Sequence, residues 1–100
     1  MIKHIVMWKL KETAAGNDKA TNALIIKEKL EALVGKIPGL LEVEVGIDFN
    51  KSDAAFDVVL YSVLENKSAL SSYQIHPEHQ AVVPVVKEAA CQRVVVDYEI

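Results

Sequence analysis

The sequence predicts an α+β fold in which a four-stranded antiparallel sheet carries helices on one face. Two observations support this prediction. Segments with strand or helix periodicity follow one another in the order β-α-β-β-α-α-β. In addition, the first and third strand segments are apolar on both of their faces, which is typical of strands in the middle of a covered sheet.

Alternation of apolar and polar residues identifies the strands. The predicted strands are residues 2–10, 41–49, 55–64 and 93–99. In the first strand, His4 and Trp8 share one face with other apolar residues, whereas Ile5 and Met7 lie on the opposite face. The second strand has one apolar and one acidic face, which indicates an edge position.

Apolar residues at helical spacing predict three helices. These cover residues 19–36, 67–75 and 77–92, and the first follows a polar loop at 11–18. Asn17 or Asp18 can cap the first helix, and Asn66 can cap the second. Pro84 falls inside the third helix, where it predicts a kink; alternatively, the main helix starts near Val83.

Short connections and right-handed crossovers fold this order of elements most simply into the ferredoxin-like layout. Its helices cover only one face of the sheet, although 51% of the residues are hydrophobic. The opposite face, with Ile5 and Met7, therefore needs a partner. We expect a homodimer whose two sheets close face to face into an α/β barrel.

Length and charge restrict the class of protein. The 100 residues are expected to form a single domain, residues 1–100. The net charge is −3 and the cations are scattered, so we expect neither a nucleic acid nor a membrane as partner. No apolar run reaches the length of a membrane span. Cys91 is the only cysteine and has no internal disulfide partner, which favours the cytoplasm.

The stretch from Tyr73 to Gln80 concentrates the residues that carry chemistry. It holds one phenol and two imidazoles, those of Tyr73, His76 and His79. Pro77 turns the chain between the two histidines and suits the first position of a helix. A bent pair of helices can therefore direct Tyr73 and His79 into one pocket, which His4 can reach from the first strand.

Each histidine also has a purely structural interpretation. His79 is either a core histidine hydrogen-bonded to a carbonyl or to Tyr73, or a general base or ligand-binding group. His76 is expected to serve the turn. A metal site built from the three histidines is a further alternative, but the spacing across Pro77 suits two ligands poorly, so we expect no metal and no cofactor.

Three segments resemble the stress-responsive dimeric α/β-barrel (Dabb) family over essentially the whole chain. These are residues 3–11, 73–79 and 94–98, with Ile37-Pro38-Gly39 following the first helix. The resemblance implies a small homodimer of undefined biochemical activity. Some plant members are cofactor-free polyketide cyclases. By this resemblance, His79 would act as the base, Tyr73 would assist it, and His4 would help to shape the site.

Two hypotheses follow. In the first, the protein is a stress-associated dimer that is non-enzymatic or of undefined activity, in which a pocket lined by His4, Trp8, Tyr73, His79 and Val83 can take a small apolar or aromatic ligand. In the second, it is a cofactor-free enzyme resembling the cyclases, in which His79 is the general base and Tyr73 donates to an oxyanion. An open cavity between sheet and helices that reaches His79 and Tyr73 discriminates between them. If Trp8, Phe56 and Leu70 fill that space, the enzyme hypothesis loses its substrate site.

Overall fold

The computed structural model describes residues 1–100. The elements in chain order are β1 (Ile2–Leu10), β2 (Thr13–Ala14), β3 (Asn17–Asp18), α1 (Lys19–Glu31), β4 (Leu40–Ile47), β5 (Val58–Leu64), α2 (Lys67–Ile75), α3 (Pro77–Ala89) and β6 (Ala90–Glu99).

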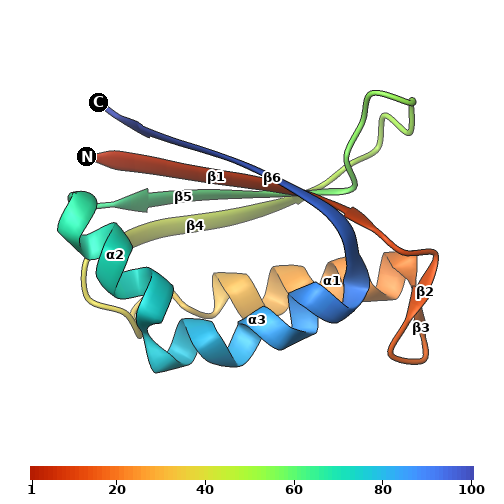
Figure 1. Cartoon of the computed structure of the whole chain (residues 1–100), viewed down its shortest axis with the longest axis horizontal. Helices are drawn as coiled ribbons and strands as arrows, with labels where there is room; N and C mark the ends of the chain where they lie inside the picture. The colour runs from red at the N-terminus through yellow and green to blue at the C-terminus, as the bar shows by residue number, and fades with distance from the viewer.

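The main sheet has four antiparallel strands in the order β4-β5-β1-β6. The predicted α+β, ferredoxin-like fold is confirmed, with β1 and β5 central and β4 at an edge. All three helices lie on one side of this sheet (Figure 1). The other side carries no helix, so the sheet has one face covered by its own chain and one face left open.

The core lies between the sheet and the helices. On β1, the side chains of Ile2, His4, Val6, Trp8 and Leu10 are buried, as their shared face predicts. Ile26 and Leu30 of α1 pack against this layer and are almost completely buried. The alternate residues of β1 point to the uncovered face of the sheet. There, Ile5 lies opposite Tyr61 of β5 and Val96 of β6.

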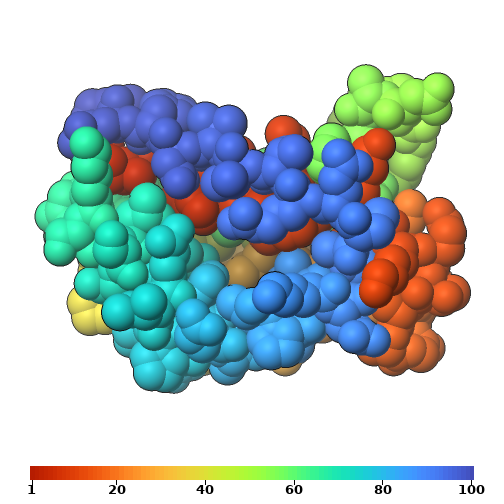
Figure 2. All heavy atoms as spheres, in the orientation of Figure 1, coloured from red at the N-terminus to blue at the C-terminus, as the bar shows by residue number.

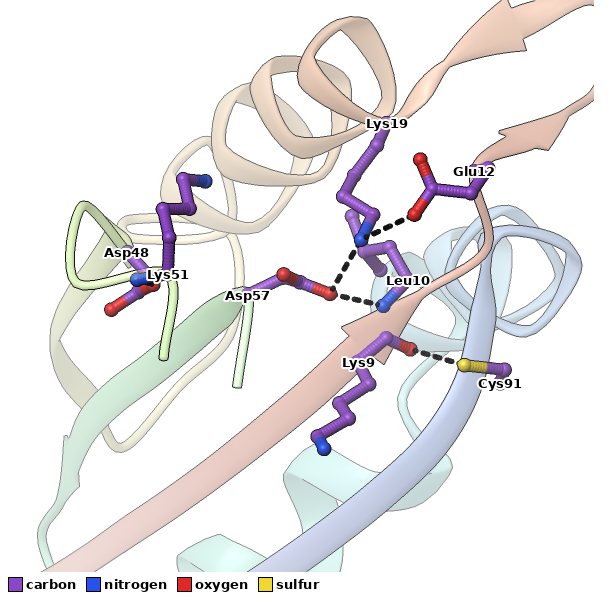
Figure 3. Close-up of polar contacts among 8 residues, drawn as sticks. All are labelled: Lys9, Leu10, Glu12, Lys19, Asp48, Lys51, Asp57 and Cys91. Atoms are coloured by element: carbon purple, nitrogen blue, oxygen red, sulfur yellow. Dashed lines mark hydrogen bonds and ion pairs between the residues drawn. The ribbon is translucent and has the colours of Figure 1, made fainter. Parts of the chain in front are cut away.

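Asp57 holds the end of β1 beside the start of β5. Its Oδ2 accepts a hydrogen bond of 2.7 Å from the backbone N–H of Leu10 and lies 3.5 Å from Nζ of Lys19 (Figure 3). Its backbone N–H donates to the carbonyl of Trp8 at 2.9 Å. These contacts tie β1 to the first residue of α1 and thereby fix the position of Trp8.

Several predicted boundaries were wrong, mostly where backbone geometry overrides periodicity. The first helix ends at Glu31 instead of residue 36, and the chain reverses through turns that include Gly35 at φ +88°. Residues 11–18 contain the short β2–β3 hairpin, although Asp18 caps α1 as predicted by accepting from Thr21 N–H.

The second strand is Leu40–Ile47 instead of 41–49, and the third begins at Val58 instead of 55. Residues 48–57 form a loop that protrudes from the sheet on the side away from the helices (Figure 1). Phe49 in this loop is 93% exposed. Phe56 is half-buried in a surface hollow beside it and does not belong to the core.

The last helix ends at Ala89 instead of residue 92, and the last strand begins at Ala90. The alternative in which the main helix starts near Val83 was wrong, because α3 is one helix with Pro84 inside it. Pro84 is exposed, so the hydrogen bond that it removes lies where water can replace it. No helix of this fold has the length and apolar character needed to span a membrane.

Candidate functional site

An open cavity of about 310 Å³ lies between the sheet and the helices. A space-filling view shows a hollow between β6 and α3, with parts of β1 and α1 at its base (Figure 2). The cavity is lined by His4, Val6, Trp8, Leu30, Leu60, Tyr73, His79, Val82, Val83, Val86, Lys87 and Arg93. All five residues expected to line a pocket are among them. Trp8 forms part of the wall, and neither Phe56 nor Leu70 fills the space.

The corner between α2 and α3 brings Tyr73 and His79 together. His76 adopts an extended conformation there, and its Nδ1 accepts a hydrogen bond of 3.1 Å from the backbone N–H of Glu78. Pro77 follows at the first position of α3. His76 thus caps α3 outside the cavity, whereas the rings of Tyr73 and His79 meet inside it with centroids 4.4 Å apart.

Tyr73 presents a buried phenol. Its side chain is only 1% exposed, and no protein group forms a hydrogen bond with its hydroxyl. Burial raises the pKa of Tyr73 to about 12, although the nearby charge of Arg93 acts in the opposite direction. The phenol therefore keeps its proton at neutral pH and has a hydrogen bond left to donate.

His79 is half-buried in the same wall. Its Nδ1 lies 3.2 Å from the carbonyl oxygen of Gln74, which can only accept a hydrogen bond. The proton of the neutral ring is thus on Nδ1, and Nε2 carries a lone pair. Burial lowers the pKa of His79, opposed by the Gln74 carbonyl and reinforced by the charges of His4 and Arg93. His79 is therefore suited to accept a proton near neutral pH.

His4 lies beneath these two rings on β1 and is 4% exposed. Its Nδ1 contacts the carboxylate of Asp97, which is its partner residue on β6. Its ring meets that of Tyr73 edge-on at 6.0 Å. Because a carboxylate accepts a hydrogen bond, Asp97 places the His4 proton on Nδ1 and fixes the orientation of the ring.

Asp97, Lys87 and Arg93 were not among the predicted site residues. Arg93 lies opposite Trp8 in the β1–β6 ladder, so both side chains belong to the sheet face that meets the helices. The alternation of the last strand places Arg93 and Asp97 on one face. Only the pairing of β6 with β1 shows that this face meets the helices, with Arg93 lining the cavity and Asp97 in contact with His4. Lys87 lies on the exposed side of α3 and carried no recognisable signal.

The chain has no cluster of three or more His, Cys, Asp or Glu side chains arranged to hold a metal ion. The three histidines do not converge on one point. The ring of His76 caps the start of α3, whereas His4 and His79 line the cavity.

Comparison with known proteins identifies relatives along the full chain. The family model described as Stress responsive A/B Barrel Domain (Dabb) matches residues 2–100. An uncharacterized protein of Streptomyces coelicolor is 34% identical over 99 residues, which are 99% of each chain. A crystal structure from Bacteroides fragilis, described as a dimeric protein of unknown function with a ferredoxin-like fold, is 34% identical. It covers 99% of this chain and 95% of its own, with a TM-score of 0.87.

A more distant structure shares the fold alone. The hydroxynitrile lyase of Passiflora edulis is 18% identical, with a TM-score of 0.82 over 99% of this chain and 92% of its own. Relatives of unknown function and an enzyme thus share this architecture, so the fold by itself does not specify an activity.

Proposed function

The chain belongs to the stress responsive A/B barrel domain family, and on that premise we propose that it binds a small apolar or aromatic ligand in the cavity between sheet and helices. The family has no single defined activity that could be carried over. The proposal therefore rests on the chemistry of the cavity wall, which is mainly apolar and includes the neighbouring rings of His4, Tyr73 and His79.

The observation that carries the proposal is the Tyr73 hydroxyl. A buried donor without an acceptor costs about 1–3 kcal/mol, and proteins seldom retain one without a reason. A ligand with a carbonyl or hydroxyl oxygen would accept this hydrogen bond, while its apolar part would contact side chains such as Val6 and Leu60. The unpaired phenol thus matches a ligand with one acceptor on an apolar body.

A thermal-shift screen with small aromatic and polyketide-like carbonyl compounds tests this proposal. We expect ligands that stabilise the wild type to give much smaller shifts with Tyr73→Phe and His79→Ala. His76→Asn is the matched control, because asparagine can still cap α3 while the histidine outside the cavity is removed. Equal shifts in wild type and His79→Ala would remove His79 from the binding site, and no shift with any compound would count against a ligand pocket.

A second candidate function is cofactor-free proton transfer next to a carbonyl group, as in the polyketide cyclases. This candidate is favoured because two complementary rings lie side by side. The neutral imidazole of His79 has Nε2 available, the phenol of Tyr73 is protonated, and their ring centroids are 4.4 Å apart. His79 would remove a proton from the carbon beside the carbonyl, and Tyr73 would donate a hydrogen bond to the developing oxyanion. His4, whose ring is held in place by Asp97, would shape the bottom of the cavity.

Proton exchange separates binding from catalysis. Ketones that give a thermal shift are incubated in D₂O, and NMR follows the loss of the proton beside the carbonyl. The enzyme hypothesis predicts exchange that depends on His79 and is unaffected by His76→Asn. Binding without accelerated exchange would leave the protein a ligand-binding module. The Passiflora lyase supports only the point that this architecture can hold an enzyme site.

We further propose that residues 1–100 act as one domain, in the cytoplasm, as a homodimer. The uncovered sheet face supports the dimer, because Met7, Val94 and Val96 remain exposed there by 38%, 38% and 59%. The description of the Bacteroides fragilis relative as dimeric agrees with it. Two such faces packed together would form the expected barrel and leave each cavity on the outer, helical side.

A further inference from the structure

The cavity is positively charged although the protein is acidic. The chain carries a net charge of −3, but the only charged side chains that line the cavity, apart from the histidines, are Lys87 and Arg93. No Asp or Glu side chain lines it. The carboxylate of Asp97 contacts Nδ1 of His4 but does not itself line the cavity. An apolar pocket lined by two cations and no carboxylate favours a ligand with a negative charge of its own.

Arg93 is the only arginine of the chain. Its guanidinium forms no ion pair, whereas lysines elsewhere pair with Glu12, Glu31, Asp57 and Glu99. Its charge nevertheless acts at the polar end of the cavity. Burial raises the pKa of Tyr73 and Arg93 partly offsets that rise, whereas burial lowers the pKa of His79 and Arg93 adds to that decrease. Arg93 is therefore a free cation whose field acts inside the cavity.

The two cations stand at the mouth of the cavity. A second hollow of about 260 Å³ adjoins it and shares the residues Trp8, Val86, Lys87 and Arg93. Tyr73 and His79 line only the inner space. The pocket is thus polar at its inner end, apolar along its walls and cationic where it opens to the outer hollow.

We infer that the ligand is a monocarboxylic acid with a compact apolar or aromatic body, whose carboxylate binds Arg93 at the mouth of the cavity. This inference rests on the proposed ligand-binding function and specifies the ligand class. The planar guanidinium donates two parallel hydrogen bonds to a carboxylate, and Lys87 adds a second positive charge. The apolar body enters between Val6, Leu60 and Val82 and presents an oxygen to Tyr73.

Isothermal titration calorimetry at low salt with two matched probes tests the inference. 6-Hydroxy-2-naphthoate carries the carboxylate and a second oxygen that can reach Tyr73, and 6-(hydroxymethyl)-2-naphthol has the same aromatic body and phenolic oxygen without the carboxylate. We expect wild-type protein to bind the acid at least about tenfold more tightly than the alcohol, as a charge-assisted hydrogen bond implies. In Arg93→Gln, acid and alcohol should bind alike. Arg93→Lys should keep part of the preference, because it retains charge without the bidentate geometry.

Lys36→Gln is the control, since it removes one exposed cation far from the cavity and should leave the preference unchanged. Arg93 is exposed on an edge strand, so its substitution is not expected to prevent folding, which circular dichroism checks. Equal binding of acid and alcohol by the wild type, or an undiminished preference in Arg93→Gln, would overturn the inference and leave the proposed function standing. If the wild type binds neither probe, the proposed ligand pocket fails together with the inference.

Discussion

Replacing Tyr73 with phenylalanine should stabilise the protein without ligand. Most substitutions of a buried residue destabilise a protein, so this prediction has an unusual sign. The hydroxyl is buried and no protein group accepts its hydrogen bond, whereas in the unfolded chain it bonds to water. Phenylalanine removes that unpaired group and retains the ring that packs between His4 and His79.

The magnitude follows from the cost of an unpaired buried donor, about 1–3 kcal/mol. We expect the free energy of unfolding of Tyr73→Phe to rise by about 1 kcal/mol, the lower end of that range, because loss of the oxygen also removes some contacts. For a domain of this size, such a change raises the midpoint of thermal unfolding by about 4–8 °C.

Urea unfolding of wild type and Tyr73→Phe at one protein concentration provides the measurement. The midpoint should rise while the slope of free energy against urea stays constant, because the surface exposed on unfolding is unchanged. Tyr61→Phe is the matched control. Its hydroxyl contacts Nζ of Lys3 on the opposite sheet face, so its removal should not stabilise the protein. A Tyr73→Phe protein that is clearly less stable than wild type would show that the hydroxyl is satisfied in the fold, and would refute its assignment as a free donor for a ligand.

Two further predictions concern His79 and the uncovered sheet face. Burial holds the pKa of His79 below the 6.5 of an unfolded chain, so the unfolded state binds a proton first as the pH falls. The free energy of unfolding should therefore decrease as the pH drops from 6.5 toward the folded-state pKa, and urea midpoints of His79→Gln should show a weaker decrease. An identical pH dependence in both proteins would contradict the lowered pKa. Ile5→Lys places a charge between Tyr61 and Val96 on the face expected to pair in the dimer, so sedimentation should show monomers where the wild type shows dimers. A wild type that sediments as a monomer at micromolar concentration would defeat the dimer proposal.

Much of the fold was accessible from local patterns. The alternation in β1 predicted which side chains are buried, because successive strand residues point to opposite faces and only one face meets the helices. Asn66 was recognised as a cap, and Asp18 as one of two candidates, because their side chains can accept from the exposed N–H groups of a helix start. Element ends were less accurate. Apolar spacing continues to residue 36, but α1 ends at Glu31 and is followed by turns in which Gly35 has a φ of +88°. Apolar spacing alone does not reveal such turns.

The amino-acid sequence by itself determined the order of the three helices and the four strands of the main sheet, although not the β2–β3 hairpin. It also determined the corner at Pro77, and so placed Tyr73 and His79 near one another. Only the tertiary structure decided that a cavity remains open between them, because local periodicity says which face is buried but not how completely it is filled. It also decided that Asp97 and Arg93 join the site. Arg93 lines the cavity and Asp97 contacts His4 because β6 pairs with β1. That pairing joins chain ends about ninety residues apart, which local pattern does not encode.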